Sequence, residues 1–291
     1  MKIICTGGRG FISSYLVREL RKNGYDTIPL DIIGNENDIK INILNEKQLE
    51  DFFKAETDIG AVYHLAGPVL EGVRKDQVNS VKLTVNGTLN ILEMCRKFDI
   101  PKIMFASTFY VYDGFGENEI VNEETRIDGL KAELFGSVKL FGESLIKEYC
   151  KKQGISYVIF RFGSAYGPDE RCSNVVKDFV TKANTKDKID IWGKGLRKNQ
   201  YTYVGDIAKG CALALNSKNE TFNLISPEQT STGEIARLID RKIGFNYYFD
   251  ESKPEGKSMP YMSSLKAINI LKWRPIDINT GIDRVMEWTK S

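Results

Sequence analysis

The sequence predicts an α/β protein built on a doubly wound parallel sheet, and three features of its first 165 residues support that prediction. Short apolar segments alternate with longer segments whose apolar residues recur at helical spacing. Strand segments such as Ala61–Leu65 and Lys102–Ala106 are apolar at successive positions, as in strands that are covered on both faces. The helical segments between them supply the right-handed crossovers that parallel strands require.

The expected elements follow one another along the chain in this order. Strands are expected at Lys2–Cys5, Thr27–Asp31, Ile39–Ile43, Ala61–Leu65, Lys102–Ala106 and Tyr157–Phe160. Helices are expected at Phe11–Lys22, Glu46–Phe53, Gln77–Phe98 and Phe135–Gln153. The first helix ends at Asn23-Gly24, because glycine accepts the left-handed conformation that closes a helix.

The alternation weakens after residue 165. Three more helices are expected among loops, at Val175–Ala183, Asp206–Leu215 and Thr232–Ile243. We therefore expect a sheet domain over residues 1–165 and a smaller C-terminal region over residues 166–291, between which the chain can cross. Ligands of doubly wound sheets bind outside the carboxyl ends of the strands, so the functional residues are expected at that edge.

The composition argues against several classes of protein. With 41 basic and 39 acidic residues among 291, the net charge of +2 offers no field for nucleic acid or an anionic membrane, and neither partner is expected. The N-terminus lacks a signal-peptide pattern, and no apolar stretch approaches the roughly 18 residues that span a bilayer. The single histidine, His64, argues against a histidine-rich metal site and a Ser-His-Asp hydrolase, so no metal is expected. Five cysteines without a Cys-x-x-Cys pair indicate reduced thiols and a cytoplasmic location.

A glycine-rich turn follows the first strand directly and leads into the first helix. Its glycines, Gly7, Gly8 and Gly10, let the backbone turn sharply and let a phosphate approach main-chain N–H groups at a helix N-terminus. Asp31 ends the second strand 21 residues after Gly10, where a carboxylate accepts hydrogen bonds from both ribose hydroxyls of NAD and repels the 2′-phosphate of NADP. Arg9 is the opposing feature, because it could reach such a phosphate. The alternative is a tight turn that binds nothing, but the combined pattern favours a Rossmann-type site for NAD.

Segments spread through nearly the whole chain form a recognisable series. They are Thr6-Gly7-Gly8-Arg9-Gly10-Phe11-Ile12, His64-Leu65-Ala66-Gly67, Val85-Asn86-Gly87-Thr88, Ala106-Ser107-Thr108-Phe109-Tyr110-Val111-Tyr112, Tyr166-Gly167-Pro168, Tyr203-Val204-Gly205-Asp206 and Leu271-Lys272-Trp273-Arg274-Pro275. In this order they resemble the landmarks of the extended short-chain dehydrogenase/reductases, the NAD-dependent epimerases and dehydratases of nucleotide sugars. The resemblance implies a Rossmann-type fold with a smaller C-terminal substrate-binding region, a nucleotide-sugar substrate, hydride transfer at a sugar carbon, and a homodimer formed through the two long helices.

The glycine turn, Asp31 and the resemblance together define an expected cofactor site. Asn42 and Ile43, at the end of the third strand, are expected to flank the adenine, where an amide can bond the exocyclic amine. His64 is expected to be structural rather than catalytic. The expected cofactor-binding residues are Gly7, Gly10, Phe11, Ile12, Asp31, Asn42, Ile43, Leu65, Ala66, Gly67 and Lys139.

The chemistry of the resembled family uses Tyr-x-x-x-Lys on a helix, in which the tyrosine exchanges a proton with the sugar hydroxyl and the lysine holds the nicotinamide ribose. Here Phe135 stands at the tyrosine position and has no proton to exchange, while Lys139 lies four residues later on the same helix face. Thr108 is expected to bind the reacting hydroxyl, which leaves proton transfer to Tyr110, to water or to no group. The chain is then an enzyme with another proton carrier, an inactivated substrate-trapping variant, or a protein that binds NAD or a nucleotide sugar without turnover.

Other positions also depart from the family pattern. Ser13 stands in place of the third glycine, Thr84 and Ser164 each stand in place of asparagine, and Asn199 stands where an arginine often meets the diphosphate. These departures weaken the expectation of standard epimerase chemistry more than that of cofactor binding. For Arg197, binding of a phosphate and an ordinary surface charge are equally expected. The expected substrate-binding residues are Thr108, Ser164, Asn174 and Arg197.

Overall fold

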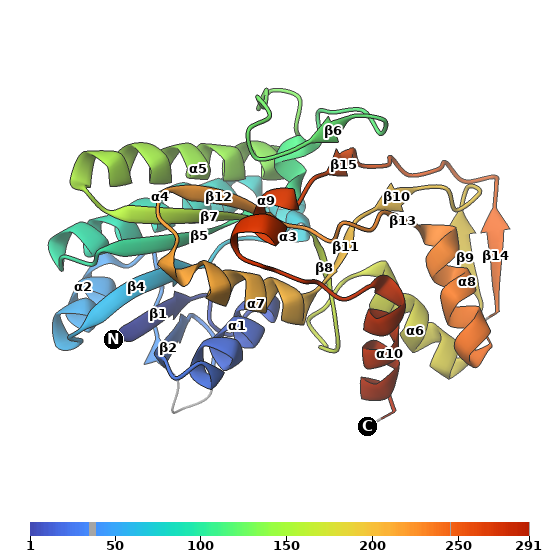
Figure 1. Ribbon diagram of the computed structural model, residues 1–291, viewed down its shortest axis with the longest axis horizontal. Helices are drawn as coiled ribbons and strands as arrows, with labels where there is room; N and C mark the ends of the chain where they lie inside the picture. Colours follow the sequence, from blue (N-terminus) through green and yellow to red (C-terminus); the bar gives the residue numbers. More distant parts are fainter. Residues whose placement is uncertain (35–38, 245, 291) are drawn as a thin grey trace. The chain divides into compact units, whose positions relative to one another are not determined.

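The computed structural model describes residues 1–34, 39–244 and 246–290, and the chain folds into two compact units (Figure 1). Unit 1 consists of Met1–Gly114, Arg126–Phe162 and Ala208–Phe222. Unit 2 consists of Phe115–Thr125, Gly163–Ile207 and Asn223–Ser291. The chain therefore crosses between the units several times, and each unit contains segments that lie far apart in the sequence.

Unit 1 is built on a parallel sheet. The strand order is β12 (Glu220–Leu224), β7 (Ser156–Phe162), β5 (Lys102–Thr108), β4 (Ile59–His64), β1 (Lys2–Thr6), β2 (Asp26–Asp31) and β3 (Ile39–Lys40). The pairings from β3 to β7 are all parallel, and this architecture confirms the expected α/β fold class. The strand order reverses between β1 and β4, so the carboxyl ends of these strands flank the position where ligands of such sheets bind.

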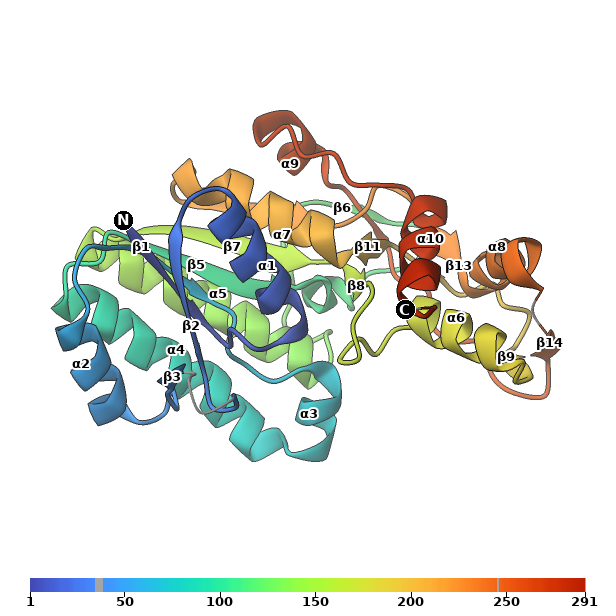
Figure 2. The ribbon, with the colours of Figure 1, turned by 90° about the horizontal axis from the view of Figure 1, so that it is seen from below.

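Helices cover both faces of this sheet (Figure 2). On one face lie α1 (Phe11–Lys22) and α7 (Val204–Leu213), whose Cys211 carbonyl accepts a hydrogen bond from the buried Tyr63 hydroxyl of β4. On the other face lie α2 (Glu46–Ala55), α4 (Gln77–Lys97) and α5 (Leu134–Gln153).

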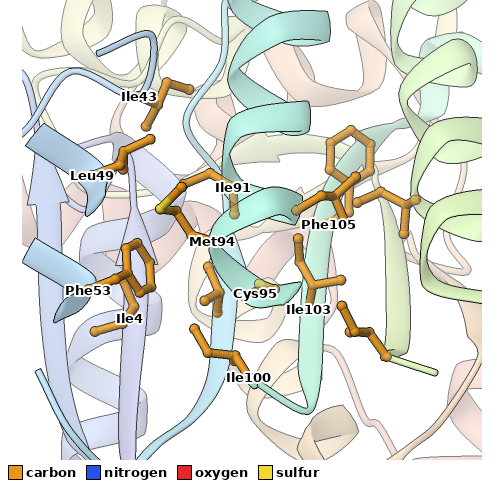
Figure 3. Packing of buried hydrophobic residues seen from close by; sticks show 14 of the residues in the cluster. Ile4, Ile43, Leu49, Phe53, Ile91, Met94, Cys95, Ile100, Ile103 and Phe105 are labelled. Atoms are coloured by element: carbon orange, nitrogen blue, oxygen red, sulfur yellow. The ribbon is translucent and has the colours of Figure 1, made fainter. Parts of the chain in front are cut away.

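The main hydrophobic core of unit 1 lies between the sheet and this second layer of helices. Figure 3 shows Phe53 of α2 packed toward Ile4 of β1, and Cys95 of α4 close to Ile103 of β5. Ile146 of α5 belongs to the same cluster. Because the strands are buried on both faces, their sequences are apolar at successive positions.

The expected order of strands and helices in unit 1 is confirmed; most strand boundaries differ by one or two residues, and the third strand was predicted too long. The third strand ends at Lys40 and not at Ile43, because the chain turns there and Asn45 N–H donates to Asn42 O at 2.8 Å. The expected helix from Asp206 to Leu215 is α7, which begins and ends two residues earlier and is followed by a 3-10 turn. Sequence analysis did not predict α3 (Leu70–Lys75), the 3-10 helix η1 (Phe109–Tyr112) or β12, and the two helices are too short to show a helical period.

Unit 2 combines short strand pairs with helices. Within its described residues, β6 (Ile120–Val121) pairs with β15 (Tyr261–Met262), β8 (Ser164–Tyr166) with β11 (Tyr201–Tyr203), β9 (Ile189–Trp192) with β14 (Tyr247–Asp250), and β10 (Lys198–Asn199) with β13 (Thr230–Ser231). The helices are α6 (Val175–Thr185), α8 (Thr232–Ile243), α9 (Leu265–Ile270) and α10 (Ile278–Trp288). Trp273 is buried, and its indole N–H donates to Asp206 O at 2.8 Å, which anchors the last part of the chain.

The contact of α5 with β5 leaves no room for a side chain at Gly142. A Cβ atom built on Gly142 would lie 2.7 Å from Cζ of the buried Phe105. Gly142→Ala gains about 1 kcal/mol of helix propensity, but overpacking a core costs about 1–3 kcal/mol. We therefore expect Gly142→Ala to lower the free energy of unfolding in urea denaturation. Ser144→Ala, at an exposed position of the same helix, is the matched control, and a Gly142→Ala protein as stable as the wild type would contradict this packing.

Candidate functional site

The glycine turn between β1 and α1 has room only for backbone. Gly7 has a φ of +66°, and a Cβ atom at this position would lie 2.8 Å from both N and Cα of Ala66. Gly10 N–H donates to Gly7 O at 2.9 Å, and no side chain of the described ranges caps the N-terminus of α1. The first N–H groups of α1, starting at Phe11 and Ile12, have no acceptor within the helix. A turn of this shape fits an anionic diphosphate, which such N–H groups and the helix dipole attract.

Asp31 ends β2 beside this turn. Its Oδ2 accepts a hydrogen bond from Arg9 N–H at 2.9 Å, and its Oδ1 accepts one from Ile32 N–H at 2.7 Å. These backbone donors fix the half-buried carboxylate, which keeps lone pairs for further donors. The two hydroxyls of an unphosphorylated ribose fit this acceptor, whereas a phosphate at the same position would be repelled.

His64 ends β4 and forms a buried link from β1 to α4. Its Nδ1 lies 2.8 Å from Thr6 Oγ1, and its Nε2 lies 3.1 Å from Thr88 Oγ1. The Thr88 hydroxyl donates to Thr84 O at 2.5 Å, so it accepts from the Nε2–H of the ring, while Nδ1 accepts from the Thr6 hydroxyl. The imidazole therefore fixes the distances between β1, β4 and α4 next to the Leu65–Gly67 segment.

The protonation state of His64 agrees with this structural link. Burial, and to a smaller extent the charge of Lys139, lower the pKa of His64 to about 3, so the ring is neutral near pH 7. Thr6 Oγ1 also accepts from Ala66 N–H at 3.3 Å, which ties the segment after β4 to the end of β1.

Lys139 of α5 lies next to the Leu65–Gly67 segment. Its Nζ donates to Ala106 O at 2.9 Å, and a Cβ atom built on Gly67 would lie 3.2 Å from this Nζ. Burial lowers the pKa of Lys139 to about 8, while the charge of Glu143 acts to raise it. Near pH 7 the side chain is therefore mostly an ammonium, which has three N–H donors and can also bond the hydroxyls of a ligand.

Thr108, Tyr110 and Phe135 come together where β5 ends and α5 begins. Thr108 is buried, and its Oγ1 accepts a hydrogen bond from Tyr110 N–H at 3.3 Å. The rings of Tyr110 and Phe135 meet edge to face, with centroids 5.7 Å apart and an interplanar angle of 65°. This approach requires a glycine at 136, since a Cβ atom there would lie 2.3 Å from Tyr110 O. The side chain in contact with Phe135 thus carries a phenol hydroxyl.

Sequence reasoning missed a cation near this group, Arg74 of α3. Its guanidinium forms ion pairs with Glu133 at 3.2 Å and with Glu71 at 3.3 Å. Glu133, and more weakly Glu71 and Tyr110, raise the pKa of Arg74. A single arginine in a short helix has no periodic pattern, so only the folded chain reveals that it lies in electrostatic range of Tyr110.

The expected adenine contacts, Asn42 and Ile43, lie in the loop between β3 and α2. Ile43 is buried against α4, where a Cβ atom built on Gly87 would lie 2.5 Å from Ile43 Cδ1, and Asn90 Nδ2 donates to Ile43 O at 3.0 Å. The exposed Asn42 accepts a hydrogen bond from Leu44 N–H through Oδ1 at 2.9 Å. The loop is thus firmly attached to α4.

In unit 2 the structure brings Ser164 and Asn174 into contact. Asn174 Nδ2 donates to Ser164 Oγ at 3.0 Å and to Ala165 O at 3.1 Å. Its Oδ1 accepts from Val176 N–H at 3.0 Å and caps α6. The Asn174 amide is therefore engaged in the fold, whereas the Ser164 hydroxyl accepts in this pair and keeps its proton for another acceptor.

Arg197 belongs to a different loop of unit 2, between β9 and β10. It is exposed, its Nε donates to Lys257 O at 3.3 Å, and its backbone N–H donates to Glu255 Oε1 at 3.0 Å. Asn199 is buried, and its Oδ1 accepts from Gln200 N–H at 2.8 Å. Arg197 therefore presents its cation at the surface, whereas the Asn199 side chain is buried.

Two further features of the described residues concern metals and membranes. Across ranges 1–34, 39–244 and 246–290, no three His, Cys, Asp or Glu side chains gather as ligands for a metal ion. Over the same ranges, no helix combines the length and apolar character needed to cross a membrane.

Comparisons with known proteins agree with this geometry. The sequence profile of the NAD dependent epimerase/dehydratase family matches residues 3–224. A protein of Methanocaldococcus jannaschii named "Putative UDP-glucose 4-epimerase" is 36% identical over 305 residues, which cover 99% of this chain and 98% of that protein.

Solved structures of the same fold span the whole chain. The UDP-glucose 4-epimerase of Thermotoga maritima with UDP-glucose has a TM-score of 0.89 at 24% identity, covering 100% of this chain and 99% of that one. The UDP-glucuronic acid 4-epimerase of Bacillus cereus with UDP-glucuronic acid and NAD has a TM-score of 0.84 at 28% identity, with the same coverage. The expected Rossmann-type fold and the expected family are confirmed, and NAD is the cofactor for which that family is named. The chain belongs to the NAD dependent epimerase/dehydratase family.

Proposed function

We propose that this chain is an NAD-dependent epimerase of a nucleotide sugar in which Tyr110 carries the proton in place of the family's tyrosine. The main supporting observation is the edge-to-face contact of Tyr110 with Phe135, at 5.7 Å between ring centroids, next to the buried Thr108. Phe135 lacks a hydroxyl, whereas the neighbouring Tyr110 has one that can exchange a proton. Dehydration or reduction of the sugar would use the same hydride chemistry and is the alternative outcome at the same site.

The proposed NAD site lies at the carboxyl ends of β1, β2 and β4 in unit 1. Bound NAD would supply a hydride acceptor and donor for a sugar carbon. The Gly7–Gly10 turn and the start of α1 would bind the diphosphate, Asp31 would bind the adenosine ribose, and Lys139 would bind the nicotinamide ribose. The fixed Asp31 carboxylate and the buried Lys139 ammonium support these assignments. The remaining proposed contacts are Asn42 and Ile43 to the adenine, and Leu65, Ala66 and Gly67 along the cofactor.

Thr108 and Tyr110 would act on the reacting hydroxyl of the sugar. The Thr108 hydroxyl would hold it by a hydrogen bond, and the Tyr110 oxygen would accept its proton during oxidation and return it during reduction.

We propose a UDP-hexose as the substrate. The relatives support this choice. One is named as a UDP-glucose epimerase, and two solved structures hold UDP-glucose or UDP-glucuronic acid. In unit 2, Ser164 and Arg197 would contact the nucleotide part, and Asn174 would complete this group of substrate-binding residues. The free hydroxyl proton of Ser164 and the exposed guanidinium of Arg197 suit a phosphate or a base carbonyl, while Asn174 would act by holding Ser164.

The outer surface of α4 and α5 supports a homodimer. Val78 is 73% exposed, Phe141 51% and Leu134 37%, and the half-buried Val81 and Val85 lie on the same side of α4. Exposed apolar side chains of two adjacent helices are typical of a surface that is covered by a second copy.

The cysteines bear on the location of the protein. All five are buried free thiols, which supports a reducing compartment such as the cytoplasm.

Replacing the Tyr110 hydroxyl tests the proposed proton carrier. Tyr110→Phe should lower the rate of epimerisation of UDP-glucose or UDP-glucuronic acid by about 10²–10⁴-fold, because a general acid/base is lost. NAD affinity, measured by calorimetry, should change little. The double variant Tyr110→Phe/Phe135→Tyr should regain activity, since it moves the hydroxyl to the neighbouring ring.

Tyr149→Phe is the matched control for this experiment. It removes a phenol hydroxyl near the other end of α5, where Tyr149 donates to Glu93, and should leave turnover unchanged. Full activity of Tyr110→Phe would sink the assignment of Tyr110. An inactive wild type that gains activity only with Phe135→Tyr would instead identify a protein that binds its ligands without turnover, an alternative that Phe135 itself favours.

Charge on the exposed α4–α5 surface tests the homodimer. Phe141→Lys should yield a monomer in analytical ultracentrifugation, because a lysine ammonium is strongly disfavoured in an apolar interface. Leu213→Lys on α7 is the matched control, since Leu213 is 50% exposed and lies on the other face of the sheet. A wild-type monomer, or a Phe141→Lys dimer as tight as the wild type, would contradict the proposed interface.

A further inference from the structure

A buried carboxylate, Glu143, lies one helical turn after Lys139 on α5. Only 1% of its surface is exposed. Its Oε1 accepts hydrogen bonds from the Ser107 hydroxyl at 2.5 Å and from Arg161 Nε at 2.9 Å, and its Oε2 accepts one from Arg161 Nη2 at 2.7 Å. Burying a charge is costly unless it is paired and hydrogen-bonded, and these three donors meet that condition.

Arg161 of β7 is the equally buried counter-ion. It is 3% exposed, its Nη1 donates to the Tyr112 hydroxyl at 2.6 Å, and its guanidinium carbon lies 5.0 Å from the centre of the Tyr112 ring. Burial acts to lower the pKa of Arg161, but the hydrogen bonds and charge of Glu143 outweigh it and raise that pKa. The Glu143–Arg161 ion pair therefore joins α5 to β7, and its hydrogen bonds with the Ser107 and Tyr112 hydroxyls add β5 and η1 to the network.

The same network borders Lys139. Adjacent residues of β5 bind the two side chains, because Ala106 O accepts from Lys139 Nζ and Ser107 donates to Glu143. Lys139 and Glu143 are four residues apart and share a face of α5. Of the described titratable side chains, the neutral His64 of β4 interacts with the charge of Lys139, and Arg161 of β7, which bonds to Tyr112 of η1, pairs with Glu143. Tyr110 of η1, and Arg74 of α3 with its partner Glu133, lie near the start of α5.

We propose that Glu143 is a positioning residue for Lys139: its pairing with Ser107 and Arg161 fixes α5 on β5, and its negative charge keeps the Lys139 ammonium available to the nicotinamide ribose. This inference rests on the NAD site proposed above. Without the carboxylate, Lys139 and Arg161 would be two buried cations with no anion between them. The lysine would then release its proton more readily, since the arginine remains charged.

The pH dependence of NAD affinity tests this inference, because calorimetry needs no turnover. Burial lowers the pKa of Lys139 to about 8, with Glu143 acting against that shift, so wild-type affinity should fall as the pH rises through about 8 and the ammonium becomes an amine. Glu143→Gln should shift the midpoint of this loss of affinity to lower pH by about one unit or more. A neighbouring charge in a buried site shifts a pKa by that order. Glu143→Asp, which keeps the charge, should retain a midpoint closer to the wild type. Lys139→Met should bind weakly and lose the fall.

The outcomes separate a charge effect from a structural one. A folded Glu143→Gln protein with the wild-type midpoint would overturn the inference, even if its affinity were lower at every pH, and the NAD site would stand. Glu143→Gln leaves Arg161 unpaired, so Glu143→Gln/Arg161→Gln provides a second variant without a buried unpaired charge. Its midpoint should also lie below that of the wild type, and an unchanged midpoint would count against the inference. Wild-type protein that binds no NAD, or binds it without a fall near pH 8, would overturn both this inference and the proposed role of Lys139.

Discussion

The close approach of two backbone segments, the turn after β1 and the segment after β4, constrains the rest of unit 1. A side chain at Gly7 would collide with the backbone of Ala66, so the two segments meet without an intervening group. His64 stabilises this close approach through its hydrogen bonds to Thr6 and Thr88. Burial lowers the pKa of its ring and keeps it neutral. Because the strand order reverses between β1 and β4, the turn lies at the edge of the sheet where ligands of such folds bind. The proposed diphosphate site depends on this arrangement.

Helix α5 supplies the second half of the site from three successive turns of one face. Phe135 contacts Tyr110, Lys139 bonds to Ala106 O, and Glu143 pairs with Arg161. The spacing of four residues brings each side chain over the carboxyl end of β5 or its neighbours. In the proposed function, Phe135 stands at the position of the family's tyrosine, while the other two residues keep their buried contacts. The proposed cofactor binding and proton transfer would thus rely on different turns of the helix.

Local sequence patterns predicted the parts of the site that depend on local geometry. The glycine turn and Asp31 were expected from their spacing around the first helix, Lys139 was expected from the resemblance to the family, and the parallel sheet was expected from the alternation of elements. The pairing of Glu143 with Arg161 joins residues of α5 and β7, and the proximity of Arg74 to Tyr110 joins α3 to η1, so neither has a local signal. The third strand was predicted too long because Asn42 and Asn45 turn the chain at a point where apolar residues continue. The hydrogen bond from Asn174 to Ser164 likewise joins residues of different elements and has no local signal.

In the proposed function, backbone N–H groups after β1, together with Asp31, bind the diphosphate and adenosine ribose of NAD. Calorimetric titration of the folded wild-type protein with NAD and, separately, with NADP tests this assignment. We expect saturable binding of NAD and weaker binding of NADP, because the Asp31 carboxylate would repel a 2′-phosphate. Absence of NAD binding by protein with native circular dichroism, or a preference for NADP, would contradict it.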